Sequence, residues 1–185
     1  GFCAACNQGP EKCTAEFILL LNPDACLYEN SLPTAYQYLK EHADVGVCSI
    51  QLVEEGNKIQ RTCARFPTPK MLIVHSTGLN RLPFIDAKSY HMGDWDHRDT
   101  REVDHVIGAF YLIRRSLFEQ LNGFDEERFF VYLEDLDLSY RVKQAGYKIV
   151  YLTEAQAFHE GGGTSSQVKA TRLFYSLRSR MLYAF

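Results

Sequence analysis

The sequence lacks any run of about 18 apolar residues, which excludes an ordinary membrane-spanning helix. It also lacks a charge excess: 20 Lys and Arg against 23 Asp and Glu give a formal net charge of −3, so we expect no binding to nucleic acid. Residues 1–7 carry neither a basic nor an apolar stretch, so they are not a signal peptide. Internal repeats and low-complexity linkers are absent as well. These absences leave a globular chain of 185 residues, which we expect to form one domain over residues 1–185.

Cysteine is present, but not in a pattern typical of a structural site. All six cysteines fall between Cys3 and Cys63, and the pair Cys3-x-x-Cys6 has no second closely spaced pair to complete a zinc site. Without a secretory signal, free thiols in a reducing compartment are the better interpretation. We therefore expect a cytoplasmic location.

The first strong pattern is the apolar run at residues 17–21, which ends at Asn22-Pro23-Asp24. Its length and continuity predict a strand buried on both faces, typical of a parallel sheet covered by helices. A carboxylate just beyond such a strand lies where open α/β sheets bind ligands, which makes Asp24 a candidate ligand for a divalent cation. The alternative is an ordinary turn, since all three residues favour turns. The local sequence does not decide between the two.

The second strong pattern is at residues 129–146, where aromatic and apolar residues lead into Glu134 and Asp135 and then into helical spacing that Gly146 ends. Both carboxylates therefore fall at a helix start, where the helix dipole favours negative charge. A carboxylate there can accept a proton from a bound hydroxyl. The alternative is the acidic first turn of an ordinary helix.

Two further segments suggest substrate contacts. Residues 103–113 predict a strand that contains Gly108 and Ala109, and a glycine inside a strand often marks a bulge or a close approach by a ligand. Residues 80–102 are polar and irregular, like a lid or an acceptor-binding loop. Within them Trp95 would suit stacking on a sugar, although a lone tryptophan is as easily a packing anchor.

The last part of the chain offers a histidine and a basic helix. His159 directly precedes three glycines, a position that suits a metal ligand or a catalytic group on a loop, although a single histidine is more often structural. Residues 167–185 predict an amphipathic helix that could close over phosphates, lie on a membrane surface or simply dock on the sheet. Its basic residues are Lys169, Arg172, Arg178 and Arg180.

Together, Asp24, His159 and the Glu134-Asp135 pair supply metal ligands and a general base. This set suits displacement at a carbon that bears a diphosphate leaving group, where a cation neutralises the developing charge. The base would take the proton of an acceptor hydroxyl.

Five segments occur in the order found in family 2 glycosyltransferases: residues 17–24, 106–115, 123–126, 132–138 and 159–163. The sequence resembles that family over nearly its whole length, and within it the rhamnosyltransferase-like branch. The resemblance implies an α/β fold of the GT-A (Rossmann-like) type, a mixed sheet flanked by helices. It also implies inverting transfer from a nucleotide-sugar donor to a saccharide or lipid-linked saccharide acceptor, with Mg²⁺ or Mn²⁺.

The resemblance also implies roles for individual residues. Asp24 matches the end of the "DXD" metal motif, with Asn22 where many members have Asp, and His159 matches a metal-binding histidine. Asp135 matches the catalytic base, and Glu134 would support acceptor binding.

Three more positions are expected to touch substrates. Gly108 and Ala109 match the acceptor-side strand, and Arg178 matches a late basic position that meets the diphosphate.

The family normally begins with a βαβ unit that holds the nucleotide base, whereas residues 1–9 resemble the segment that follows it. We therefore expect an N-terminally truncated fold with an exposed sheet edge, which favours homo-oligomers, and a chain that is either a piece of an active enzyme or inactive alone. Contact with the inner face of the membrane is a further expectation. The alternatives are a non-catalytic sugar- or partner-binding domain and a nucleotidyltransferase, which would need a glycine-rich basic loop that is not visible here.

Overall fold

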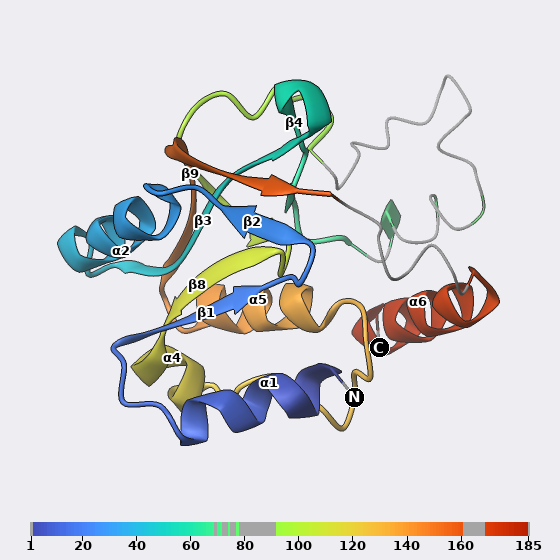
Figure 1. Cartoon of the computed structure of the whole chain (residues 1–185). Helices are drawn as coiled ribbons and strands as arrows, with labels where there is room; N and C mark the ends of the chain where they lie inside the picture. Colours follow the sequence, from blue (N-terminus) through green and yellow to red (C-terminus); the bar gives the residue numbers. More distant parts are fainter. Residues whose placement is uncertain are drawn as a thin grey trace.

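The computed structural model describes residues 2–68, 70–71, 74, 77, 92–160 and 169–184. Its helices and strands confirm the expected α/β fold (Figure 1). The helices are α1 (Phe2–Glu11), α2 (Ser31–Glu41), η1 (Glu55–Asn57), α4 (Arg115–Gln120), α5 (Glu134–Gln144) and α6 (Lys169–Ala184). The strands are β1 (Phe17–Leu21), β2 (Ala25–Leu27), β3 (Val45–Glu54), β4 (Lys58–Ile59), β5 (Cys63–Ala64), β6 (Arg101–Val103), β7 (His105–Val106), β8 (Phe110–Arg114) and β9 (Lys148–His159).

Seven of these strands form one mixed sheet in the order β1-β8-β3-β9-β2, with β4 paired to β3 and β6 paired to β9. Within the described ranges β3 and β9 are parallel, and the other pairs are antiparallel. The prediction that residues 17–21 lie in a parallel sheet was wrong, because β1 pairs antiparallel with β8 at the end of this order. Leu21 is 39% exposed, so the apolar run is not buried throughout. A short apolar run indicates a strand but not the direction of its neighbour.

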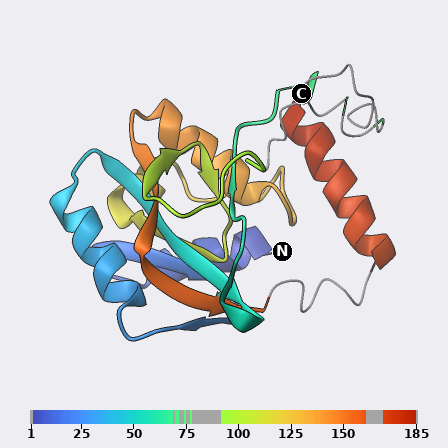
Figure 2. The same ribbon diagram turned by 90° about the horizontal axis from the view of Figure 1, so that it is seen from above.

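Helices cover both faces of the sheet (Figures 1 and 2). On one face α2 packs Ala35 and Leu39 into a core that includes Cys48 of β3. On the other, Leu117 of α4 and Leu138 of α5 pack into a second core. Successive residues of a strand point to opposite faces, and β3 and β8 accordingly contribute alternating side chains to the two cores.

One strand prediction needed correction. The strand expected at residues 103–113 is interrupted: β7 pairs with β5 in a separate two-stranded sheet, whereas β8 belongs to the main sheet. Residues 107–109 connect β7 to β8, so the chain passes from one sheet to the other at Gly108. After Gly146 the chain forms the long strand β9, whose register against β3 shifts between Ile50 and Gln51.

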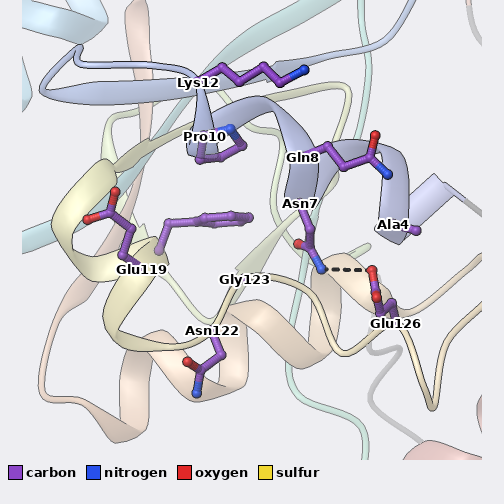
Figure 3. Close-up of a pocket in the computed structure, with 10 residues that line it drawn as sticks. Ala4, Asn7, Gln8, Pro10, Lys12, Glu119, Asn122, Gly123 and Glu126 are labelled. Carbon is purple, nitrogen blue, oxygen red and sulfur yellow. Dashed lines mark hydrogen bonds between the residues drawn. The ribbon is translucent and has the colours of Figure 1, made fainter.

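One side chain, Asn7, bonds the N-terminal helix to the segment after α4. It lies in the wall of a cavity of about 790 Å³ (Figure 3). Asn7 Oδ1 accepts the Phe124 N–H (2.8 Å), and Asn7 Nδ2 donates to the Phe124 carbonyl (2.9 Å) and to Glu126 Oε2 (3.3 Å). Gly123, with φ of 64°, makes this approach possible, because a Cβ there would lie 2.4 Å from Asn7 Oδ1. These contacts fix α1 against the turn that follows α4.

Two findings bear on the wider expectations. None of the six cysteines is in a disulfide. Among the helices of the described ranges, none has both the length and the apolar character needed to cross a membrane.

Candidate active site

Asp24 and His159 lie side by side because β2 and β9 are antiparallel neighbours. Ala25 is paired with His159, and the Glu160 N–H donates to the Asp24 carbonyl (3.2 Å). This pairing also brings the two side chains together, and Asp24 Oδ1 lies 3.3 Å from His159 Nε2. Asn22 Nδ2 lies 3.3 Å from the same nitrogen. The structure thus brings together Asn22, Asp24 and His159, three of the four residues predicted for the cation and diphosphate site.

The other ring nitrogen of His159 contacts a residue that the sequence analysis did not select. His159 Nδ1 lies 2.7 Å from Gln60 Oε1, and Gln60 Nε2 donates to the His159 carbonyl (2.9 Å). The local sequence around Gln60, which directly follows β4, does not predict this contact, because the partner is 99 residues away.

Asp135 lies in the first turn of α5 and accepts two backbone hydrogen bonds. Gly108 N–H donates to Oδ2 and Leu136 N–H donates to Oδ1, both at 2.9 Å. Tyr132 and Leu133 precede the helix in the left-handed region, with φ of 68° and 65°. This conformation is strained for residues other than glycine, and such strain gathers at functional sites. It makes α5 begin abruptly at the two carboxylates.

Glu134 is buried, with only 7% of its surface exposed, and its Oε2 atom has no hydrogen-bond partner among the described residues. Burial raises the pKa of Glu134 to about 8, and the nearby charge of Asp135 contributes to the rise. At neutral pH the Glu134 carboxyl is therefore mostly protonated and can donate a hydrogen bond. Two adjacent carboxyl groups thus have different environments.

Residues 108 and 109 tie the cation site to the α5 carboxylates. The Asn22 N–H donates to the Ala109 carbonyl (3.1 Å), and the Gly108 N–H donates to Asp135 Oδ2 (2.9 Å). Ala109 therefore contacts the first residue of the Asn22-Pro23-Asp24 turn, and Gly108 contacts the base candidate. Sequence positions more than 100 residues apart meet at this one point.

Two neighbouring cavities flank this junction. One, of about 720 Å³, includes His159 in its wall, and the other, of about 230 Å³, includes Glu134 and Asp135. Both are also lined by Arg61, Thr62 and Ile107. The two cavities therefore adjoin each other at these three residues.

A buried polar chain extends behind Asp135. His105 Nε2 lies 4.0 Å from Asp135 Oδ2, and a hydrogen bond joins His105 Nδ1 to Ser139 Oγ (2.9 Å). Ser139 Oγ lies 3.2 Å from the Tyr111 hydroxyl. Sequence reasoning missed this chain, although a histidine three residues before Gly108 is a weak signal for it.

Two predicted site residues lie elsewhere. Trp95 is 7% exposed, its ring stacks on His97, and the Arg101 guanidinium lies 4.3 Å from the ring centroid. A covered ring cannot stack on a sugar, so Trp95 is the packing anchor, and we withdraw it as an acceptor-binding residue. Arg178 lies on α6 and donates to the Arg128 carbonyl (3.2 Å), beside the segment that leads into α5.

The donor atoms around His159 fit a divalent cation shared with a phosphate. Asp24 offers a carboxylate oxygen and His159 a ring nitrogen, 3.3 Å apart, both suitable ligands for Mn²⁺. In the part of the chain that the structure describes, no group of three or more His, Cys, Asp or Glu side chains could hold a metal ion. A cation bound here would have two ligands among the described residues, and oxygens of a bound diphosphate and water would have to supply the rest.

Comparison with known proteins identifies the class. Residues 1–180 match the family described as glycosyltransferase like family 2. The chain belongs to this family.

Several curated relatives are rhamnosyltransferases. Rhamnosyltransferase WbbL of Escherichia coli (strain K12) is 32% identical over 148 residues, covering 78% of this chain and 52% of that protein. O-antigen chain rhamnosyltransferase WbaN of Salmonella anatum is 42% identical over 155 residues, covering 83% of this chain and 44% of that protein. The chain thus spans about half the length of these relatives or less.

Solved structures confirm the expected fold. A mannosyltransferase of Pyrobaculum calidifontis, in complex with GDP-Man and Mn²⁺, aligns with a TM-score of 0.58 at 16% identity, covering all of this chain and 43% of that one. GalNAc-T7, with UDP, GalNAc and Mn²⁺, aligns with a TM-score of 0.59 at 14% identity, covering 86% of this chain and 30% of that one. The expected GT-A fold of the glycosyltransferases is therefore confirmed.

Proposed function

We propose that this chain carries the catalytic core of an inverting glycosyltransferase that moves a sugar, rhamnose or another hexose, from a nucleotide-diphosphate donor to a hydroxyl acceptor in glycan synthesis. The observation that carries the proposal is the junction at residues 108 and 109. It bonds to the Asn22-Pro23-Asp24 turn on one side and to the Asp135 carboxylate on the other, beside one cavity lined by His159 and a second lined by Asp135. The names of the rhamnosyltransferase relatives support the sugar class.

Asp24 and His159 would hold Mg²⁺ or Mn²⁺, with Asn22 beside them, next to the cavity that His159 lines, which we assign to the donor. The bound cation would neutralise the negative charge that develops on the leaving diphosphate. Arg178 stays a prediction as a second diphosphate contact.

Asp135 would accept the proton of the acceptor hydroxyl. As that proton moves to a carboxylate oxygen, the hydroxyl oxygen forms a bond to the anomeric carbon. The bond from that carbon to the diphosphate oxygen breaks on the opposite face, and the diphosphate leaves with the electron pair. Attack opposite the leaving group inverts the anomeric configuration.

Glu134 complements this role because its proton can be donated to an acceptor oxygen. Its Oε2 atom has no partner within the described chain, and its side chain lines the same cavity as Asp135. An acceptor hydroxyl would satisfy this buried group, which would otherwise be costly. Residues 108 and 109 form the acceptor side of the junction.

The wider setting is also part of the proposal. One relative is an N-acetylglucosaminyl-diphospho-decaprenol L-rhamnosyltransferase of Mycobacterium tuberculosis, whose name specifies a lipid-linked acceptor. The outer face of α6 exposes Leu173, Phe174, Leu177 and Met181. A cytoplasmic enzyme that touches the inner membrane face through α6 fits both observations. Oligomerisation through β1 stays a prediction.

The test is calorimetric titration of UDP and dTDP into the chain, with and without Mn²⁺. We expect nucleotide binding that requires Mn²⁺ and is lost in Asp24→Asn, whereas the exposed control Glu127→Gln should bind like the wild type. Binding that ignores both Mn²⁺ and Asp24 would contradict the cation site. A donor that binds normally but is never transferred would favour the non-catalytic alternative.

A further inference from the structure

The orientation of the Gln60 amide is determined by its neighbours. Gln60 Nε2 lies 2.9 Å from the His159 carbonyl oxygen and 3.2 Å from Glu54 Oε1. A carbonyl and a carboxylate only accept hydrogen bonds, so the NH₂ end of Gln60 must face them. The oxygen end of the amide therefore faces the His159 ring.

This orientation determines the state of the ring. Gln60 Oε1 can only accept, and it lies 2.7 Å from His159 Nδ1, so that nitrogen must carry a proton. In the neutral imidazole the other nitrogen, Nε2, is then unprotonated and presents a lone pair. It does so toward Asp24 Oδ1, at 3.3 Å.

Two acceptor atoms that face each other repel unless a positive centre lies between them. Asn22 Nδ2 relieves this repulsion in part, because it can donate to Nε2 at 3.3 Å. Asp24 Oδ1 has no such donor from the ring in this tautomer. A neutral histidine that served only to bind Asp24 would instead carry its proton on Nε2. Its Nδ1 atom would then be an acceptor facing the Gln60 oxygen, which is also an acceptor.

From these contacts we propose that Gln60 is a positioning residue for the cation site: it fixes the His159 tautomer that keeps Nε2 available as a ligand. The inference rests on the proposed function for the meaning of the site, but the tautomer itself is a property of the metal-free protein. Gln60 would act in the way that carboxylates and carbonyls orient ligating histidines in other metal sites. No step of the transfer involves Gln60 directly.

The experiment is nitrogen NMR of the His159 ring in the metal-free chain, at a pH where the imidazole is neutral, with His159→Ala to assign the signal. We expect the proton on Nδ1 in the wild type, and a shift toward the Nε2-protonated form in Gln60→Leu. The matched control is Gln156→Leu. Gln156 is also half-buried, but it lies on β9 and donates to Gln51, so its replacement should leave the tautomer unchanged. Gln60→Met replaces Gln60→Leu if the latter does not fold, as judged by circular dichroism.

A second readout links the tautomer to the metal. Mn²⁺ affinity, followed by electron paramagnetic resonance, should fall about ten- to a hundredfold in Gln60→Leu and not in Gln156→Leu. A wild-type ring protonated on Nε2, or a tautomer unaffected by Gln60→Leu, would overturn the inference. If the tautomer depends on Gln60 but the wild type binds no Mn²⁺, the positioning contact stands and the proposed cation site fails.

Discussion

Glu134→Gln should stabilise the folded chain at neutral pH, because Glu134 is an ionisable group held in an environment that opposes its charge. Burial, reinforced by Asp135, raises the pKa of Glu134 from 4.5 to about 8. Between these two values the folded chain keeps a proton that the unfolded chain has already released. The unfolded state therefore binds fewer protons, and the free energy of unfolding falls as the pH rises.

The slope gives the size of the effect. Each pH unit between the unfolded and folded pKa costs about 1.4 kcal/mol, so the accumulated cost is about 3 kcal/mol at pH 7 and saturates near 5 kcal/mol above pH 8. Glutamine does not ionise and avoids this cost. For a domain of this size the midpoint of thermal unfolding at pH 7 should rise by roughly 6–12 °C. These are upper values, because the buried amide of glutamine also needs hydrogen-bond partners.

The assay is urea unfolding of the wild type and Glu134→Gln at several pH values, with the exposed Glu127→Gln as the matched control. The difference between wild type and variant should be near zero at pH 4.5 and grow as the pH rises. Because the Asp135 charge contributes to the raised pKa of Glu134, the difference at pH 7 should be smaller in an Asp135→Asn background. A difference that does not change with pH would refute the reasoning.

Three other substitutions test the site and the scaffold. Asp135→Asn should lower kcat about 10²- to 10⁴-fold while leaving Mn²⁺-dependent dTDP binding intact, and retained turnover would remove Asp135 as the base. His159→Ala should weaken the dependence of nucleotide binding on Mn²⁺, and an unchanged Mn²⁺ titration would exclude it as a ligand. Gly123→Ala should cost more stability than Gly56→Ala, by about 1–3 kcal/mol in thermal unfolding. Both glycines have positive φ, but only at Gly123 would the new Cβ meet a neighbour, Asn7 Oδ1 at 2.4 Å. Equal losses of stability in the two variants would show that the Asn7 side chain moves away from the new Cβ at little cost.

The parts of the fold that the sequence predicted well are those specified by local chemistry. The helix that begins at Glu134 and stops at Gly146 was expected from its apolar spacing and its glycine, and α5 has that start. The apolar run of β1 predicted a strand for the same reason. Its antiparallel pairing with β8 could not be predicted, because the direction of a neighbour depends on the connection between them rather than on side chains.

The same distinction between local patterns and distant contacts applies to the site residues. Asp24, His159 and Asp135 were selected because each follows or begins a regular element, and the structure places them around one junction. Gln60 was not selected, because its meaning depends on a partner in β9 that no local pattern reveals. Trp95 shows the converse: its type suggested a sugar contact, but its neighbours decided that it packs in the core.

The remaining departures from local rules lie together at the start of α5. Tyr132 and Leu133 adopt a conformation that costs non-glycine residues free energy, and Glu134 buries a carboxyl oxygen that has no partner in the part of the chain that the structure describes. Neither feature helps the chain fold, so the packed cores on both faces of the sheet must offset them. Both features adjoin Asp135: the backbone turns sharply just before it, and the neighbouring acid stays protonated beside it. If this cost is maintained for catalysis, relieving it in Glu134→Gln should raise stability and lower the transfer rate together. A variant that gained stability without losing turnover would show that the buried acid is not maintained for catalysis.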